Sequence, residues 1–165
     1  MTKTALLIVD VQKGFLNETT KHIPSLVEEL ISSQNYSLIC ATRFINHNNS
    51  PFVKWMGWKR FLKTETNDIE LAFSCPNSVH IFDKTTYSSL TPHLLEILQE
   101  QDIDKIYLCG MDTNMCVFMT ASNIFEHGIY EPFVLSKYCS SHSGEEFHEA
   151  GLMLLEKAIG KDHIL

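Results

Sequence analysis

Short apolar runs rich in strand-forming residues recur along the chain, and segments with helical spacing separate them. Continuous apolar runs of this kind are typical of strands that are buried on both faces of a parallel sheet. Strand-like runs occupy residues 3–10, 37–44, 79–84, 105–109 and 130–135. Helix-like segments occupy residues 23–34, 115–127 and 145–157, and a further helix begins at Thr91-Pro92. This alternation predicts a three-layer α/β/α sandwich with a mainly parallel sheet, formed as a single domain over residues 1–165.

The amino-acid composition limits the kinds of partner that the protein is expected to bind. The 165 residues are 44% hydrophobic and carry a net charge of −7, with acidic and basic residues interspersed. We therefore expect a small-molecule partner and neither nucleic acid nor a membrane surface. No apolar run approaches the roughly 18 residues of a membrane span, and the N-terminus enters a strand directly, which predicts a cytoplasmic protein. The five cysteines include no Cys-x-x-Cys pair, so neither a disulfide framework nor a structural zinc site is indicated.

Three reactive side chains lie where predicted strands end. Asp10 closes the first strand, Lys84 closes the third, and Cys116 follows the fourth in a turn that leads into a helix. Ligands of parallel sheets bind outside these carboxyl ends. At the start of a helix the backbone N–H groups and the helix dipole favour a thiolate, and a nearby lysine adds to the effect. A carboxylate, a cation and such a cysteine together predict an activated nucleophile, although a small buried core residue is an alternative role for Cys116.

Three segments resemble the isochorismatase-like cysteine hydrolases, which include nicotinamidases and N-carbamoyl amidohydrolases. The matching segments are Leu7-Ile8-Val9-Asp10-Val11-Gln12 with Phe15, Asp83-Lys84-Thr85 with Tyr87-Ser88-Ser89, and Gly110-Met111-Asp112-Thr113-Asn114-Met115-Cys116-Val117. The resemblance implies a Rossmann-like sheet and a catalytic triad of Asp10, Lys84 and Cys116. It also implies a cis peptide before Asp112 and an oxyanion hole formed by the backbone N–H groups of Asp112 and Cys116.

The segment after the second predicted strand departs from that family. Metal-dependent nicotinamidases carry an Asp-x-His pair there, whereas this chain has Arg43-Phe44-Ile45-Asn46-His47. A lone His47 without an acidic partner is a poor zinc or iron site, because such sites need three or four protein ligands. We therefore predict no catalytic metal and no other cofactor.

Several residues are candidates for substrate binding. Arg43 could pair with a carboxylate or carbamoyl oxygen of the substrate, or equally form a structural salt bridge. Residues 48–77 lack periodicity and contain Trp55 and Trp58, which could wall the active site, contact a second subunit or pack in the core. Lid segments of the family often lie at a subunit boundary, so the resemblance implies a homo-oligomer, either a dimer or a tetramer. The predicted set also includes Phe15, Tyr87 and Thr113.

These observations predict a metal-independent cysteine hydrolase that cleaves a C–N bond in a small amide or carbamoyl compound. In this scheme Asp10 accepts the thiol proton, Lys84 stabilises the thiolate and Cys116 attacks. Three other interpretations remain open. Isochorismatase itself cleaves an ether without a cysteine, which Cys116 argues against. The chain could also bind a small molecule without turnover, or sense oxidants through Cys116 and Cys139.

Overall fold

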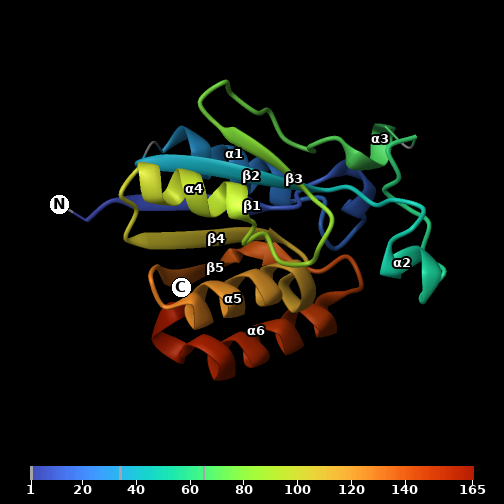
Figure 1. The fold of residues 1–165 in the computed structure, drawn as a ribbon. Coiled ribbons are helices and arrows are strands. Elements are labelled where there is room, and N and C mark those ends of the chain that lie inside the picture. The colour runs from blue at the N-terminus through green and yellow to red at the C-terminus, as the bar shows by residue number, and fades with distance from the viewer. Residues whose placement is uncertain (1, 34, 65) are drawn as a thin grey trace.

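The computed structural model describes residues 2–33, 35–64 and 66–165. Five parallel strands form one sheet in the order β3-β2-β1-β4-β5. The strands are β1 (Thr4–Val9), β2 (Leu38–Phe44), β3 (His80–Lys84), β4 (Lys105–Met111) and β5 (Glu131–Ser140). The helices are α1 (Ile23–Ser32), α2 (Pro51–Lys54), α3 (Thr66–Ile69), α4 (Pro92–Glu100), α5 (Phe118–His127) and α6 (Glu145–Ile159). In Figure 1, α4 and α5 lie in front of the sheet and α1 lies behind it, which confirms the three-layer α/β/α architecture.

Strand β1 forms the centre of the sheet and of the core. Ala5 through Val9 are buried, because β2 and β4 flank the strand and helices cover both faces. A strand in this position needs apolar side chains on both faces, which explains its unbroken apolar run. Val9 is paired with Gly110 of β4, and Phe44 of β2 is paired with Lys84 of β3. The carboxyl ends of these four strands therefore meet at one edge of the sheet.

The edges of the sheet and the helix ends refine the sequence prediction. Strand β5 runs to Ser140, well beyond the predicted end at residue 135, and its pairing shifts register between Leu108 and Gly110. Its Pro132 is tolerated because β5 is an edge strand, as predicted. Thr91 caps α4 by accepting a hydrogen bond from the Leu94 N–H, also as predicted. The predicted end of the first helix at Gln34 lies outside the described residues, and α1 ends at Ser32.

The aperiodic segment between β2 and β3 contains two short helices and is held by side-chain hydrogen bonds. The Asn46 amide donates to the carbonyl oxygens of Trp58 (3.1 Å) and Arg60 (3.0 Å). The Asn46 Oδ1 accepts from the Ser50 hydroxyl at 2.6 Å, and Ser50 in turn caps α2. In Figure 1, α2 projects beyond the strand ends. Asn46 thus fixes a segment that lacks the regular backbone pairing of a sheet.

Within the described part of the chain, no helix combines the length and the apolar character that crossing a membrane requires.

Candidate active site

Cys116 is positioned by the turn that leaves β4. Gly110 has φ of +119°, and a Cβ at this position would lie 2.1 Å from the Val9 carbonyl oxygen, so only glycine fits. The chain then forms a π-helical turn over Thr113–Val117 and continues into α5. The N–H groups of Met115 and Val117 donate to the carbonyl oxygen of Asp112, which closes this turn. The thiol is therefore held in a wide turn before α5, where sequence reasoning had expected an ordinary first helical turn.

Asp10 and Lys84 form a buried ion pair. Lys84 Nζ lies 2.7 Å from Asp10 Oδ2, and the two side chains are 1% and 0% exposed. The Lys84 ammonium also donates to the carbonyl oxygens of Thr86 (2.7 Å) and Tyr87 (2.9 Å). Asp10 Oδ1 accepts a hydrogen bond of 2.8 Å from the Thr42 hydroxyl. Buried charges need such partners, so strands β1, β2 and β3 together fix this pair in one geometry.

Both charges act on the Cys116 thiol. Burial raises the pKa of Cys116 well above its ordinary value, the negative charge of Asp10 raises it further, and the positive charge of Lys84 opposes the rise. The cysteine is 7% exposed, so loss of hydration outweighs the stabilisation expected from a helix start. The sequence predicted that the helix start and Lys84 favour a thiolate. In the structure burial opposes that effect, and the raised pKa leaves a thiol beside a carboxylate that can accept its proton.

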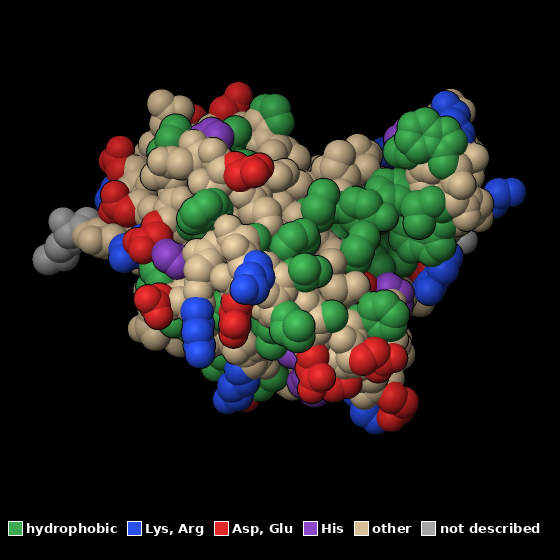
Figure 2. All heavy atoms as spheres, turned by 90° about the horizontal axis from the view of Figure 1, so that it is seen from below, with side chains coloured by type: hydrophobic (Ala, Val, Ile, Leu, Met, Phe, Trp, Pro, Cys, Tyr) green, Lys and Arg blue, Asp and Glu red, His purple; other side chains and the backbone are tan. Residues whose placement is uncertain are grey.

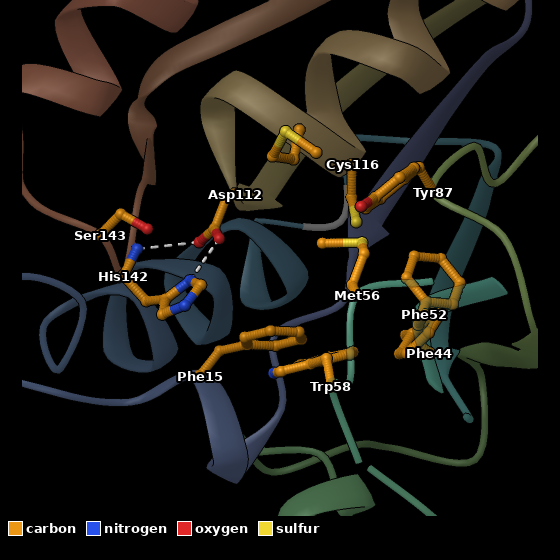
Figure 3. Close-up of a pocket in the computed structure, with 11 residues that line it drawn as sticks. Phe15, Phe44, Phe52, Met56, Trp58, Tyr87, Asp112, Cys116, His142 and Ser143 are labelled. Atoms are coloured by element: carbon orange, nitrogen blue, oxygen red, sulfur yellow. Dashed lines mark hydrogen bonds and ion pairs between the residues drawn. The ribbon is translucent and has the colours of Figure 1, made fainter. Parts of the chain in front are cut away.

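Cys116 opens onto a cavity of about 260 Å³. Figure 3 shows aromatic side chains from several elements around this cavity, with Cys116 and Tyr87 on one side and Asp112 and His142 on another. The cavity is lined by Phe15, Phe44, Phe52, Met56, Trp58, Tyr87, Asp112, Met115, Cys116, His142 and Ser143. The aromatic residues brace one another: Phe44 meets Phe52 edge to face at 5.0 Å, and Phe15 stacks on Phe61 at 4.2 Å. The arrangement offers a mostly apolar space with a nucleophile and one polar wall.

The polar wall consists of Asp112 and His142, which sequence reasoning did not pair. Asp112 Oδ1 accepts a hydrogen bond of 2.9 Å from the backbone N–H of His142, and Asp112 Oδ2 bonds to His142 Nδ1. The hydrogen bond that His142 donates to the Asp112 carboxylate raises the pKa of His142, and partial burial opposes this effect. The sequence offers one signal for this contact, the polar stretch Ser140-Ser141-His142-Ser143 at the end of the last strand.

Comparison with known proteins assigns the family. The family model of the Isochorismatase domain matches residues 4–161, which is nearly the whole chain. The chain belongs to the isochorismatase family. Isochorismatase family protein 2A of Dictyostelium discoideum is 26% identical over 152 residues, which cover 87% of this chain and 70% of that protein. Isochorismatase domain-containing protein 2 of Xenopus laevis is 40% identical over 63 residues, which cover 38% of this chain and 30% of that protein.

Solved structures of other family members share the fold. A pyrazinamidase of Pyrococcus horikoshii in complex with zinc has a TM-score of 0.80 at 24% identity, and 98% of this chain and 97% of that chain are covered. A pyrazinamidase/nicotinamidase of Streptococcus mutans has a TM-score of 0.81 at 21% identity, covering 99% of this chain and all of the other. At these identities the comparison establishes the isochorismatase-like hydrolase fold and leaves the substrate open.

Three of the predicted substrate-binding residues line the cavity, and three do not. Phe15, Trp58 and Tyr87 belong to its wall. Phe15 is also buried against Phe61, so it both lines the cavity and packs in the core. Helix α2 ends at Lys54, and Trp58 lies in an irregular segment beyond it. Trp58 and Trp55 therefore do not share a helical face.

The other three candidates face elsewhere. Arg43 forms a two-point salt bridge with Asp83, at 2.7 and 3.0 Å, which is the structural alternative to substrate binding. Trp55 is 83% exposed and lines a neighbouring surface groove instead of the cavity. The Thr113 hydroxyl is buried and bonds to His148 Nδ1 of α6 at 2.7 Å. For Arg43 the structure shows the salt bridge that was the alternative to substrate binding, and Trp55 and Thr113 do not line the cavity in the described residues.

Two structural features bear on the predicted oxyanion hole. The peptide bond between Met111 and Asp112 is cis, as the family resemblance implied. Both Asp112 and Cys116 line the cavity. The assignment of their backbone N–H groups to an oxyanion stays a prediction.

The described residues contain no cluster of three or more His, Cys, Asp or Glu side chains that could hold a metal ion. His47 instead lines a separate surface pocket together with Asn46, Asn48 and Asp83. The donor set at this edge of the sheet therefore does not fit the three or four ligands that a zinc or iron site needs.

Proposed function

We propose that this protein is a metal-independent cysteine hydrolase that cleaves a C–N bond in a small amide or carbamoyl compound. One observation carries the proposal. The buried Asp10–Lys84 pair acts electrostatically on Cys116, and Cys116 opens onto a cavity of about 260 Å³ that could enclose a small organic molecule. The parts needed for nucleophilic acyl transfer therefore converge at one place.

The first half of the reaction forms a thioester. Asp10 takes the proton from Cys116 Sγ as the sulfur bonds to the carbonyl carbon, and Lys84 balances the charge that passes between them. The resulting oxyanion accepts hydrogen bonds from the backbone N–H groups of Asp112 and Cys116, each worth about 3 kcal/mol when removed in comparable enzymes. The C–N bond then breaks, and the proton on Asp10 goes to the departing nitrogen.

The second half of the reaction releases the acid. A water molecule loses its proton to Asp10 and attacks the thioester carbon, and the C–S bond breaks as the proton returns to the sulfur. A high resting pKa of Cys116 suits this cycle, because the thiol ionises only when Asp10 is placed to receive its proton. The aromatic walls exclude bulk water and strengthen each electrostatic contact.

The proposal is tested by ammonia release from a panel of small primary amides and N-carbamoyl compounds, with a chelator present. Wild type should release ammonia and should show a mass increase on Cys116 after acid quenching. Cys116→Ser should lose at least about 10³-fold in kcat. Cys139→Ser is the matched control, because Cys139 is also buried but does not line the cavity. Equal turnover in Cys116→Ser, or turnover that needs added zinc, would contradict the proposal, and saturable binding without product would favour a binding protein.

A redox role for Cys116 and Cys139 has weaker support. Burial raises the pKa of Cys139 to about 12 and raises that of Cys116 well above its ordinary value. The negative charge of Cys139 also raises the pKa of Cys109. Oxidation needs an accessible thiolate, which neither cysteine offers at rest.

The expected homo-oligomer also stays a proposal. Figure 2 shows hydrophobic side chains gathered beside a hollow on one face of the molecule, and Trp55 and Met56 are 83% and 66% exposed. Light scattering after gel filtration should give the mass of a dimer or tetramer. A mass close to 18.9 kDa would exclude both under the conditions measured.

A further inference from the structure

The proposed reaction uses the backbone of Asp112 but neither the side chain of Asp112 nor that of His142. Both side chains nevertheless line the cavity that holds Cys116. A role for this polar wall in substrate selection follows from its geometry, and that role rests on the proposed hydrolase function.

His142 is held by three hydrogen bonds, two through its backbone and one through its ring. Its backbone N–H and its Nδ1 both bond to the Asp112 carboxylate, and its carbonyl oxygen accepts from the Asn17 amide at 2.6 Å. The ring packs 5.4 Å from the Phe15 ring, between centroids, and its side chain remains 39% exposed. Figure 3 shows the imidazole between Asp112 and Phe15 at the border of the cavity. Among the described residues no side chain or backbone group is hydrogen-bonded to Nε2.

The Asp112 carboxylate decides what Nε2 can do. A carboxylate only accepts hydrogen bonds, so a proton must reside on His142 Nδ1 in both charge states of the ring. When the ring is protonated, Nε2 carries the second proton and is a donor. When the ring is neutral, Nε2 has a lone pair and is an acceptor. The charge state of His142 therefore reverses the hydrogen-bonding character of the atom left free.

The charges around His142 favour the donor form over a wider pH range than for a free histidine. The hydrogen bond that His142 donates to the Asp112 carboxylate raises the pKa of His142, while partial burial and the positive charge of Arg60 lower it. Arg60 is itself paired with Asp68, at 2.9 Å. The thiol of Cys116, which shares the cavity, is held in its neutral form. Asp112 is thus the group that dominates the titration.

We propose that the Asp112–His142 pair selects substrates by donating the Nε2 hydrogen of the imidazolium to an acceptor atom on the part of the substrate that does not react. The substrate class is a small amide or carbamoyl compound with a flat apolar body, which fits the aromatic walls, and a carbonyl oxygen or ring nitrogen that reaches His142. His142 is a specificity-determining residue in this scheme. Asp112 positions its ring and fixes its tautomer.

Binding to the Cys116→Ser variant tests the inference without turnover. The probes are 3- and 4-acetylbenzamide, which carry a carbonyl acceptor, and 3- and 4-isopropylbenzamide, which have nearly the same shape without it. Dissociation constants are measured by calorimetry at pH 5.5 and pH 9, and the His142 ring is followed by NMR to locate its titration. At pH 5.5 one acetyl isomer should bind about tenfold more tightly than its isopropyl partner, as expected for a hydrogen bond from a charged donor. At pH 9 this preference should disappear.

Two variants separate this role from a structural one. In Asp112→Asn, the amide oxygen can still accept the backbone N–H of His142, so its NH₂ group would face Nδ1 and donate to it. The neutral ring would then carry its proton on Nε2, and the acetyl preference should persist at pH 9. In His142→Phe, the preference should be absent at both pH values while the isopropyl compounds still bind.

The outcomes are separable from those of the catalytic proposal. An acetyl preference that is unchanged in His142→Phe, or that responds to pH in the same way in Asp112→Asn and in the parent protein, would overturn the inference even if wild type hydrolyses amides. Failure of all four probes to bind at millimolar concentration would overturn the assigned substrate class. Loss of turnover in wild type, with the acetyl preference intact, would overturn only the hydrolase proposal.

Discussion

The neighbouring residues Asp83 and Lys84 at the end of β3 each form an ion pair. One pair is exposed to solvent and the other is buried. Lys84 turns inward to Asp10, where the side chains are 1% and 0% exposed. Asp83 turns outward to Arg43, where the side chains are 49% and 32% exposed. Both pairs have short distances of 2.7 Å, and both join different strands of the sheet. Distance alone therefore does not distinguish the pair beside the nucleophile from the pair on the surface.

The pleat of the strand makes the distinction. Successive side chains of a strand point to opposite faces, so Asp83 and Lys84 cannot serve the same site. The inner pair has lost its hydration and is held by hydrogen bonds with Thr42 and two backbone carbonyls, whereas solvent screens the outer pair. Burial makes the Asp10–Lys84 pair important for both stability and chemistry. The exposed Arg43–Asp83 pair contributes little to either.

The largest expected effect comes from removing the inner cation. Lys84→Met leaves the Asp10 carboxylate buried without a charged partner, which should lower the free energy of unfolding by about 3–5 kcal/mol. Turnover of any amide substrate should also be lost. Urea unfolding followed by circular dichroism measures the first effect, with Arg43→Met as the matched control from the outer pair. Equal destabilisation by the two variants would remove the distinction between the inner and the outer pair.

A double variant separates the two roles of the inner pair. Asp10→Asn combined with Lys84→Met removes both charges, and asparagine tolerates the positive φ of 48° at position 10. The double variant should regain about 2 kcal/mol over Lys84→Met alone, because no unpaired charge remains. It should have no hydrolase activity, because the proton acceptor is gone. A double variant as unstable as Lys84→Met would show that packing, and not charge, holds this site.

The reactivity of Cys116 should respond to the inner pair only. Its pKa is raised by burial and by Asp10 and is lowered by Lys84, so alkylation by iodoacetamide should keep accelerating above pH 9 in wild type. Lys84→Met removes the opposing charge and should slow alkylation at every pH below the new pKa. Mass spectrometry gives the rates, with the half-buried Cys75 as an internal reference and Arg43→Met as the control. Fast alkylation of Cys116 well below pH 8 would instead indicate a thiolate in the resting protein.

The smallest effect is expected at the outer pair. Arg43→Ala should cost at most about 1 kcal/mol of stability, and 0.5 M salt should reduce that cost, because the pair is solvent-exposed. The kcat/KM of an identified substrate should not change. A large rise in KM would return Arg43 to the substrate-binding residues, although its guanidinium bonds to Asp83 in the structure.

Parts of the site were predictable because they follow from strand geometry. Asp10 and Cys116 follow the buried strands β1 and β4, Lys84 is the last residue of the edge strand β3, and the carboxyl ends of parallel strands meet at one edge. Sequence order and the two-residue period of a strand were sufficient to place them together. The same two-residue period separates Arg43 from the site. Arg43 pairs with Asp83, and the side chain of Asp83 points to the opposite face from that of Lys84.

Other parts depended on contacts between distant segments. Trp58 enters the cavity and Trp55 does not, because Asn46 pins the carbonyl oxygen of Trp58 and α2 ends at Lys54. The sequence alone offered no hydrogen-bonding pattern for this segment. The spacing of the two tryptophans would place them on one face only in a helical turn, and α2 ends at Lys54, before either of them.

The sequence by itself determined the parallel sheet, the order of its elements and the three residues at its edge, because local periodicity and burial specify these features. The tertiary structure alone decided the direction of the pKa shift of Cys116 and the partner of Asp112. Loss of hydration depends on everything packed around the thiol, and His142 reaches Asp112 across 30 positions of sequence. Both are properties of the surroundings in space, which no local pattern contains.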